Sequence, residues 1–326
     1  MKAAILEQFN HPLTIKNLEI PTPQPNEVLV KVKASGLNPL DIKIQQGAAA
    51  HAQVALPAVP GIDMAGIIER PGDNVRSFKA GDEVFGMAGG IGKLQGTLAE
   101  YVSVDADLLA LKPANLSFKQ AAAIPLVFIT AWQALANKGK VTFGQTVLVH
   151  GGAGGVGHVA VQLALAKGAG VFATVSHNNR ELIESYGAIP IDYTRLSVEQ
   201  YVNEYTDGLG FDLVLDTIGG SVLDDSFKAV KRNTGHVVSI LGWGTHSLAP
   251  LSFRSATYSG VFTLYPLLSG EERASYGNIL REATKLIEAG KLRPFVSSTH
   301  YTLETVNNAY ADLANKSISG KIVVEI

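Results

Sequence analysis

Three glycines with a fixed spacing are the residues of this sequence whose chemistry follows most directly from their positions. Gly152, Gly154 and Gly157 fit the pattern G-x-G-x-x-G. The first glycine permits a tight turn, the second lets a pyrophosphate approach the backbone, and the third lets a helix pack closely on a strand. The free N–H groups at the start of that helix then face the phosphates. The loop also contains Gly155 and Val156.

The segments around the loop decide how much weight the glycine pattern carries. Residues 146–150 (TVLVH) are a β-branched and aliphatic run typical of a buried parallel strand, and HVAVQLALA after the loop has helical periodicity. Another apolar run, residues 171–175, follows the helix. A purely structural glycine-rich loop is the alternative, but a strand, a glycine loop, a helix and a second strand in this order predict a dinucleotide site.

The end of the second strand indicates which dinucleotide is bound. NAD sites usually carry an acidic residue there for the ribose 2′-hydroxyl, and this sequence has Ser176 instead. Ser176, His177 and Arg180 could bind a 2′-phosphate through charge-assisted hydrogen bonds, which predicts NADPH. The alternative is that His177 and Arg180 form the solvated start of a helix.

The segments that must position this site show two different patterns of predicted secondary structure. Residues 1–120 contain short apolar runs separated by Pro-Gly, Gly-Asp and Asp-Asn turns, which predicts a compact β-rich domain resembling a barrel. Residues 121–265 alternate strands and helices, which predicts a doubly wound parallel sheet of the Rossmann type. Residues 266–326 end in KIVVEI and are expected to return to the first domain. The predicted fold class is therefore α/β with an additional β-rich domain.

Composition excludes several classes of function. The chain has 326 residues and a net charge of −2, so it has no overall basic character for nucleic acid. It contains no cysteine, which excludes disulfides, thiolate zinc sites and a cysteine nucleophile. Neither a long apolar N-terminal run nor a bilayer-spanning stretch is present, so the expected location is the cytoplasm.

No strong acid–base or nucleophile constellation stands out. The eight histidines show no HExxH spacing, and no G-x-S-x-G nucleophile elbow occurs. Hydride transfer needs fewer protein groups, because the cofactor carries the difficult chemistry and the protein orients the reactants and stabilises developing charge. An electron-poor quinone or an enone accepts hydride without a metal.

The order of motifs resembles the medium-chain dehydrogenase/reductase superfamily, and most closely its zinc-free quinone oxidoreductase branch, the zeta-crystallin-like group. The motifs span nearly the whole chain: ASGLNPLDIK, VPGIDMAGII, GDEVFG, the glycine loop, FDLVLDTIGG and SGKIVVEI. The resemblance implies a GroES-like catalytic domain, formed by both ends of the chain, around a Rossmann domain. It also implies a homodimer joined through edge strands, for which residues 258–264 (Tyr258 to Leu264) are the candidate.

The sequence departs from the zinc-dependent members of that family. Those members place Cys in the first motif and His in the second, where this chain has Asn38 and Ile62. Neither residue replaces thiolate or imidazole, so no metal site is expected. Asp63 and Asp82 are expected to make hydrogen bonds at loops.

The resemblance also implies roles for individual residues. Asn38 is expected to face the nicotinamide and the substrate, and Thr130 to bind the carboxamide. Lys43 could donate to an oxyanion or be an ordinary surface lysine, and Asp41 could orient Lys43 or simply cap a turn. Tyr193 matches a family position near the 2′-phosphate, with a packing aromatic as the alternative. The ends of two further strands supply the remaining cofactor-binding candidates: Thr217, Ile218, Ser239, Leu241 and Gly242.

The leading functional hypothesis is a zinc-independent, NADPH-dependent oxidoreductase that transfers hydride to a small hydrophobic quinone or another activated carbonyl acceptor. A 2-alkenal, enone or enoyl-thioester double-bond reductase uses the same scaffold and stays open. A non-catalytic NADPH-binding, crystallin-like protein is the alternative from a different class.

Overall fold

The computed structural model describes all residues, 1–326, and the chain divides into two compact units. Unit 1 comprises Met1–Ile129 and Leu264–Ile326, and unit 2 comprises Thr130–Thr263. The first division falls inside helix α3 (Pro125–Trp132). Sequence patterns predicted the divisions at 120/121 and 265/266. No helix is long and apolar enough to cross a bilayer.

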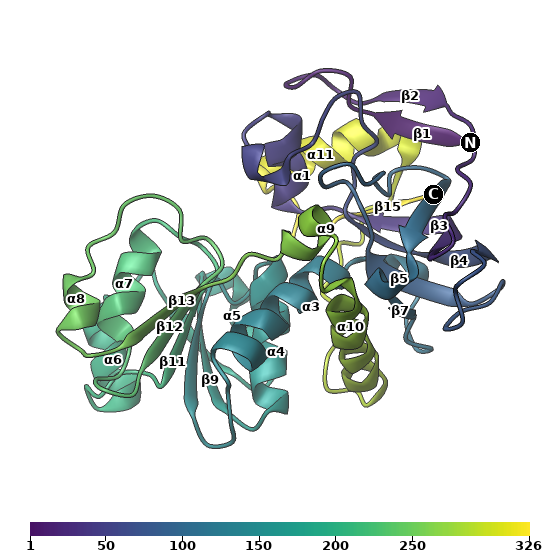
Figure 1. Ribbon diagram of the computed structural model, residues 1–326. Coiled ribbons are helices and arrows are strands. Elements are labelled where there is room, and N and C mark those ends of the chain that lie inside the picture. Colours follow the sequence, from purple (N-terminus) through teal and green to yellow (C-terminus); the bar gives the residue numbers. More distant parts are fainter. The chain divides into compact units, whose positions relative to one another are not determined.

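Unit 2 contains a six-stranded parallel sheet in the order β10-β9-β8-β11-β12-β13 (Figure 1). Counted along the unit, this is the strand order 3-2-1-4-5-6 of the doubly wound fold, so the order reverses next to β8. The strands are β8 (Thr146–His150), β9 (Gly170–Val175), β10 (Ile189–Asp192), β11 (Leu213–Asp216), β12 (His236–Ser239) and β13 (Thr257–Gly260).

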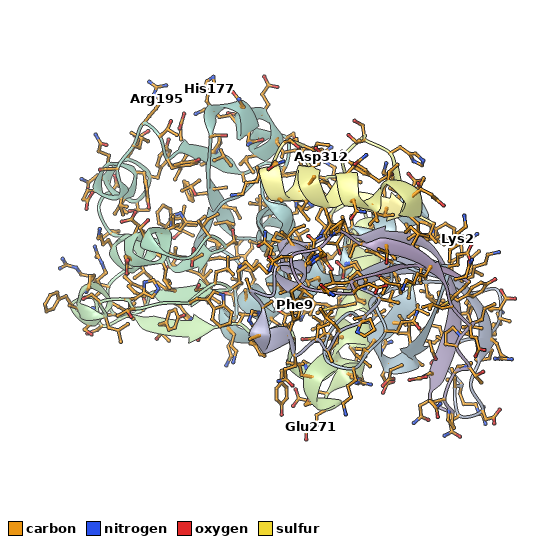
Figure 2. The ribbon with its side chains drawn as sticks, turned by 90° about the horizontal axis from the view of Figure 1, so that it is seen from above. Lys2, Phe9, His177, Arg195, Glu271 and Asp312 are labelled. Atoms are coloured by element: carbon orange, nitrogen blue, oxygen red, sulfur yellow. The ribbon has the colours of Figure 1, made fainter.

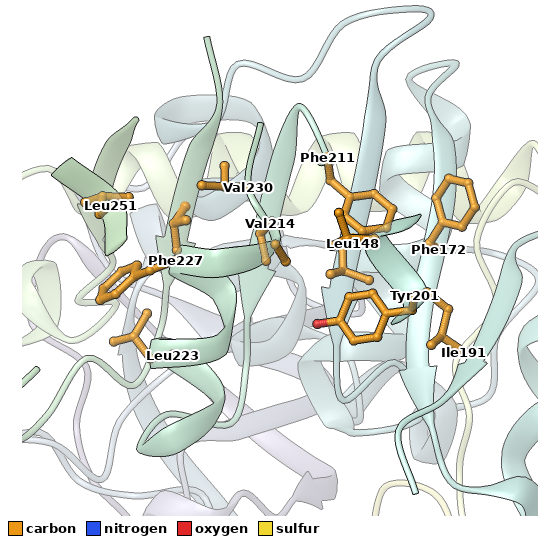
Figure 3. Close-up of a cluster of buried hydrophobic side chains, with 13 residues drawn as sticks. Leu148, Phe172, Ile191, Tyr201, Phe211, Val214, Leu223, Phe227, Val230 and Leu251 are labelled. Carbon is orange, nitrogen blue, oxygen red and sulfur yellow. The ribbon is translucent and has the colours of Figure 1, made fainter. Parts of the chain in front are cut away.

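Helices cover both faces of this sheet, with α4 and α5 on one side and α6 and α7 on the other (Figure 1). An apolar cluster fills the interface between the sheet and helices α6 and α7, and it includes Leu148, Val214 and Phe227 (Figure 3). Phe172 and Phe211 pack with ring centroids 5.2 Å apart. The helices of unit 2 are η3 (Gln133–Lys138), α4 (Gly155–Ala166), η4 (His177–Asn179), α5 (Arg180–Glu184), α6 (Val198–Thr206), α7 (Ser221–Ala229) and α8 (Ala249–Ser252).

Unit 1 is built on a seven-stranded sheet in the order β14-β15-β3-β4-β5-β7, with β6 also paired to β3. Its pairs are antiparallel except for β14 with β15. A separate hairpin-like pair joins β1 to β2. The strands are β1 (Lys2–Ile5), β2 (Thr14–Asn17), β3 (Glu27–Gly36), β4 (Asp63–Pro71), β5 (Glu83–Met87), β6 (Tyr101–Asp105), β7 (Leu109–Leu111), β14 (Tyr301–Thr302) and β15 (Val323–Glu325).

The C-terminal strand β15 pairs with β3, so the end of the chain completes the sheet that its beginning starts. This return places Lys321, two residues before β15, beside the segment that follows β3. The helices of unit 1 are α1 (Pro39–Gln45), η1 (Ala50–Ala52), η2 (Ala106–Leu108), α2 (Phe118–Ala122), α9 (Tyr265–Ser269), α10 (Arg273–Glu288), η5 (Leu303–Thr305) and α11 (Val306–Asn315).

The predicted fold class, a β-rich domain joined to a doubly wound parallel sheet, is confirmed. Ser117 and Gln120 form a capping box at the start of α2, and α3 begins at Pro125. The strand expected at residues 258–264 is shorter and ends at Gly260, but it does form the edge of the sheet.

Candidate active site

The glycine loop of unit 2 leaves no room for side chains at two of its positions. A Cβ atom on Gly157 would overlap the carbonyl oxygen of Gly151, and one on Gly152 would lie 2.6 Å from the Cβ of Ala173. Gly154 is the N-cap of α4 and is exposed, as is Gly155. The N–H groups of Gly152 and Gly154 donate within the loop, to the carbonyl oxygens of Thr174 and Gly151, and so fix its shape. The glycine cradle therefore presents the N–H groups of the first turn of α4, a 12-residue helix that begins at Gly155, and this arrangement fits a dinucleotide pyrophosphate.

Side chains from two neighbouring strands hold the loop in this conformation. The Gly151 N–H donates to Thr174 Oγ1 at 3.1 Å, and Thr217 Oγ1 donates to the carbonyl oxygen of His150 at 2.6 Å. His150 Nδ1 lies 3.1 Å from Thr174 Oγ1, and burial lowers the pKa of His150 to about 4. His150 is therefore neutral at physiological pH and serves as part of the loop's support.

Asp216 organises the second turn of the site, at the end of β11. Its Oδ1 accepts from the N–H groups of Ile218 (3.0 Å) and Gly219 (2.9 Å), and its Oδ2 accepts from Ser239 Oγ at 2.7 Å. The Leu241 N–H in turn donates to Ser239 Oγ at 3.1 Å. One buried carboxylate thus fixes the chain after β11 and after β12 together.

The predicted strand-end residues therefore lie at adjacent strand ends. They follow β11 and β12, the two strands next to β8, and in a parallel sheet the carboxyl ends lie at the same edge. These residues are Thr217, Ile218, Ser239, Leu241 and Gly242. Their contacts with the cofactor stay a prediction. Sequence reasoning missed Asp216 as the residue that positions them, although an acidic residue ending a buried strand is itself a signal.

The candidates for the 2′-phosphate lie at the ends of β9 and β10. Ser176 caps η4 and accepts from Asn179 Nδ2 at 3.2 Å. His177 is exposed, and Arg180 pairs only with the exposed Glu184 at 3.3 Å, so a phosphate can compete for its guanidinium. Tyr193 follows β10 and is 59% exposed, which argues against a packing role.

Arg195 is a further cation at this position that the sequence analysis did not select. Asp192, at the end of β10, is the common neighbour: His177 and Arg195 both lower its pKa, after its hydrogen bonds from Thr194. In Figure 2, His177 and Arg195 both project at the same edge of unit 2. A basic residue two positions after Tyr193 is the signal that could have identified it.

Thr130 is buried in unit 2 and lies close to a second threonine. Its Oγ1 is 3.0 Å from the Oγ1 of Thr263, which is also buried. A threonine hydroxyl can both donate and accept a hydrogen bond, as contact with a carboxamide requires. The role of Thr130 in binding the nicotinamide carboxamide stays a prediction.

In unit 1, Asn38 belongs to a buried polar cluster. Its Nδ2 donates to Asp63 Oδ2 at 2.9 Å, its Oδ1 accepts from Lys321 Nζ at 2.5 Å, and its backbone N–H donates to Asp41 Oδ2 at 2.8 Å. The side chain of Asn38 is 1% exposed, so its amide groups serve the cluster in this structure. Its expected position against the nicotinamide stays a prediction.

The carboxylates of this cluster titrate unusually. Burial raises the pKa of Asp41 to about 7 and that of Asp63 to about 6. Asp41 caps the N-terminus of α1, while Lys43 is exposed on the same helix. The sequence left open whether Asp41 orients Lys43 or caps a turn. The hydrogen bond from the Asn38 N–H shows Asp41 in the capping arrangement.

The residues at the positions of the zinc ligands do not fit zinc. Asn38 and Ile62 supply no thiolate or imidazole, and an ammonium group, that of Lys321, already lies on the amide oxygen of Asn38. The structure contains no group of three His, Cys, Asp or Glu residues able to hold a metal ion. Asp82 accepts from the Lys79 N–H at 2.9 Å in a loop, whereas Asp63 begins strand β4.

Comparison with known proteins agrees with this geometry. Residues 24–114 match the family model described as alcohol dehydrogenase GroES-like domain, and residues 186–324 match the one described as zinc-binding dehydrogenase. The NADPH-dependent alkenal/one oxidoreductase of Arabidopsis thaliana chloroplasts is 34% identical over 99% of this chain and 79% of its own. The chain belongs to the medium-chain dehydrogenase/reductase superfamily, in its zinc-free, quinone oxidoreductase-like branch.

Two further relatives match this chain over 99% or more of its length. Human quinone oxidoreductase is 29% identical over 99% of this chain and 97% of its own. The crystal structure of an alcohol dehydrogenase superfamily protein from Novosphingobium aromaticivorans has 52% identity and a TM-score of 0.98, covering 100% of this chain and 99% of the other. The resemblance drawn from the motifs is thereby confirmed.

Proposed function

We propose that the chain is an NADPH-dependent oxidoreductase that transfers hydride to a small, hydrophobic quinone or enone without a metal ion. The observation that carries this proposal is the glycine cradle at α4, combined with cations and no acidic residue at the position of Ser176. The relatives named as an NADPH-dependent alkenal/one oxidoreductase and a quinone oxidoreductase support it.

The residues of unit 2 bind and orient the cofactor. The N–H groups of the first turn of α4, at Gly155 and Val156, would receive the pyrophosphate, and Arg180, His177 and Arg195 would neutralise the 2′-phosphate. Bound NADPH supplies a hydride at C4 of its dihydronicotinamide ring. Thr130 would hold the carboxamide and so orient the ring, which would lower the entropic part of the barrier.

The residues around Asn38 stabilise the acceptor as it gains charge. Lys43 is exposed on α1, five residues after Asn38, and we assign it the hydrogen bond to the developing oxyanion. A quinone or enone is activated already, so one such donor is sufficient. An unactivated ketone needs stronger polarisation of its carbonyl group, and the side chains at the zinc positions cannot hold the metal ion that would supply it.

The similarity to a plant alkenal/one oxidoreductase favours a second candidate, reduction of the C=C bond of a 2-alkenal or an enone. Both reactions use the same cofactor cradle, and they differ in which atom of the acceptor receives the hydride. Parallel assays with a benzoquinone and a 2-alkenal, with product analysis by mass spectrometry, distinguish them. Hydroquinone formation supports the first candidate, a saturated aldehyde supports the second, and no product from either favours the non-catalytic, crystallin-like reading.

We also propose that unit 2 mediates a homodimer through β13. This strand ends the six-stranded sheet, and its outer edge has no strand partner within the chain. Tyr258 is 36% exposed, and Phe262, just after the strand, is 40% exposed. Light scattering should give twice the mass of the 34.5 kDa chain. The Val261 N–H donates inward to the carbonyl oxygen of Ser239 at 3.0 Å, so the N–H of the preceding residue, Gly260, faces the outer edge. Gly260→Pro should therefore shift the protein to the monomer if this edge is the interface.

A further inference from the structure

Lys321 is a lysine that the folded chain buries almost completely. Its side chain lies just before β15, and the residue is 7% exposed. The ammonium donates to the carbonyl oxygen of Leu37 at 2.7 Å and to Asn38 Oδ1 at 2.5 Å. Lysine is rarely buried unless its charge is paired, because removal from water is costly. Here the compensating charges are those of Asp41 and Asp63, which both act on Lys321.

Contacts on both sides of Asn38 fix its amide in a single orientation. The oxygen faces the ammonium of Lys321, and the nitrogen faces the carboxylate of Asp63 at 2.9 Å. Rotating the amide by 180° would place a donor against a cation and an acceptor against an anion. Asp63 is itself held, since its Oδ1 accepts from the Leu126 N–H at 2.9 Å. The Asn38 turn is therefore held by two residues from distant parts of the sequence, Lys321 and Asp63.

A stabilising role alone does not account for this cluster. Well-packed apolar side chains of similar volume are often as stable as a buried ion network, or more so. What the network adds is one defined conformation of the backbone at Leu37 and Asn38, from which α1 begins. Lys43, the proposed oxyanion donor, lies on that short helix.

We propose that Lys321 is a positioning residue, whose ammonium holds the Leu37–Asn38 turn and thereby sets where α1 carries Lys43. The effect on catalysis through Lys43 rests on the proposed function. The holding of the Leu37–Asn38 turn by Lys321 does not. The ammonium of Lys321 thus contacts Asn38, the residue at the position where zinc-dependent members of the superfamily carry a cysteine ligand.

Hydrogen–deuterium exchange of the peptide covering residues 36–44 tests the structural part without any substrate. Lys321→Met keeps an unbranched side chain as far as the ε position and removes the ammonium. Exchange of this peptide should become at least about tenfold faster, while peptides of unit 2 stay unchanged. Lys321→Arg retains a cation and should keep exchange closer to wild type than Lys321→Met. The matched control is Lys291→Met, at an exposed lysine.

Steady-state kinetics tests the catalytic part. At a temperature where the variants are folded, Lys321→Met should lower kcat for the acceptor by about tenfold or more, because a donor displaced by about 1 Å loses catalytic effect of that size. Unchanged exchange and unchanged kcat in a folded Lys321→Met variant would overturn the proposal, as would faster exchange spread uniformly over unit 1. Absence of turnover in wild type would count against the proposed function, whereas the exchange result stands separately.

A second variant covers the case in which Lys321→Met does not fold. Combining it with Asp63→Asn removes one buried charge of each sign, which avoids leaving an uncompensated carboxylate. This double variant should fold and still show faster exchange at residues 36–44. Wild-type protection in the double variant would contradict the assignment of Lys321 as the group that holds the turn.

Discussion

A Cβ atom on Gly157 would overlap the carbonyl oxygen of Gly151, so the first turn of α4 packs directly on the backbone of the glycine loop. Gly157→Ala must therefore push the helix away from the loop. We expect a loss of about 1–3 kcal/mol of stability, as for other overpacked sites, and at least about tenfold weaker NADPH binding. Calorimetry and fluorescence titration measure these effects.

Gly170→Ala is the matched control for this substitution, because the nearest atom to its Cβ position, the oxygen of Gln145, is 3.9 Å away. It should bind NADPH as wild type does. Equal affinities for Gly157→Ala and Gly170→Ala would mean that the loop does not contact the pyrophosphate.

Arg180→Ala and Arg195→Ala should each separate the two nicotinamide cofactors. Loss of one charge-assisted hydrogen bond to the 2′-phosphate should weaken NADPH binding by about tenfold and leave NADH within about twofold. Dissociation constants from calorimetric titration give both values, and Arg281→Ala, on the exposed face of α10, is the control. A parallel loss for NADPH and NADH would remove the residue from the phosphate site.

Lys43→Met should affect the chemical step more than substrate binding. An oxyanion donor acts mainly in the transition state, so kcat should fall by about 10²-fold while KM changes little. Steady-state kinetics with the better acceptor measures the split. If kcat is retained, Lys43 is a surface lysine, which is the alternative that its sequence position also allowed.

Asp41→Asn should change how stability depends on pH. Burial raises the folded-state pKa of Asp41 from 3.8 to about 7, so the folded chain holds a proton that the unfolded chain releases between these values. The contribution of Asp41 to stability therefore falls as pH rises from about 4 to about 7. Burial also raises the pKa of Asp63, to about 6, so Asp63 adds to this fall in stability. Burial lowers the pKa of His150 to about 4, so His150 has the opposite effect on stability.

The comparison of variant with wild type isolates the contribution of Asp41. Relative to wild type, the melting temperature of Asp41→Asn should rise by about 2 °C or more between pH 5 and pH 8. Lys321 and Tyr310 are the other titratable groups that act on this carboxyl, and both stay in place. Asp207→Asn, at an exposed C-cap, serves as control. If the difference in melting temperature between Asp41→Asn and wild type did not change with pH, the proton taken up by the folded cluster would lie on a group other than Asp41.

Local patterns made part of this site predictable. The glycine loop lies within seven consecutive residues between a strand and a helix, and the sheet order then brings Thr217 and Ser239 to the edge next to it. Parallel strands place their carboxyl ends together, so strand ends identify such residues even without contacts.

The buried cluster of unit 1 could not be predicted in the same way. It joins Asn38, Asp63 and Lys321, which are far apart in sequence. Asp63 reaches Asn38 because β4 pairs with β3, and Lys321 reaches it because β15 pairs with β3. Nothing in SGKIVVEI distinguishes a buried lysine from an exposed one, because the burial depends on the partners. Asp216 was hidden for a related reason: its role depends on hydrogen bonds to turns after two different strands.

The central claim, NADPH-dependent reduction without a metal, is tested most directly by turnover of chelator-treated protein whose metal content has been determined. We expect far less than one zinc per chain, and kcat/KM for NADPH with a quinone or 2-alkenal within about twofold of untreated protein, since the side chains at the zinc positions suit no zinc ligand set. One zinc per chain, with turnover lost on chelation and restored by added zinc, would contradict the account.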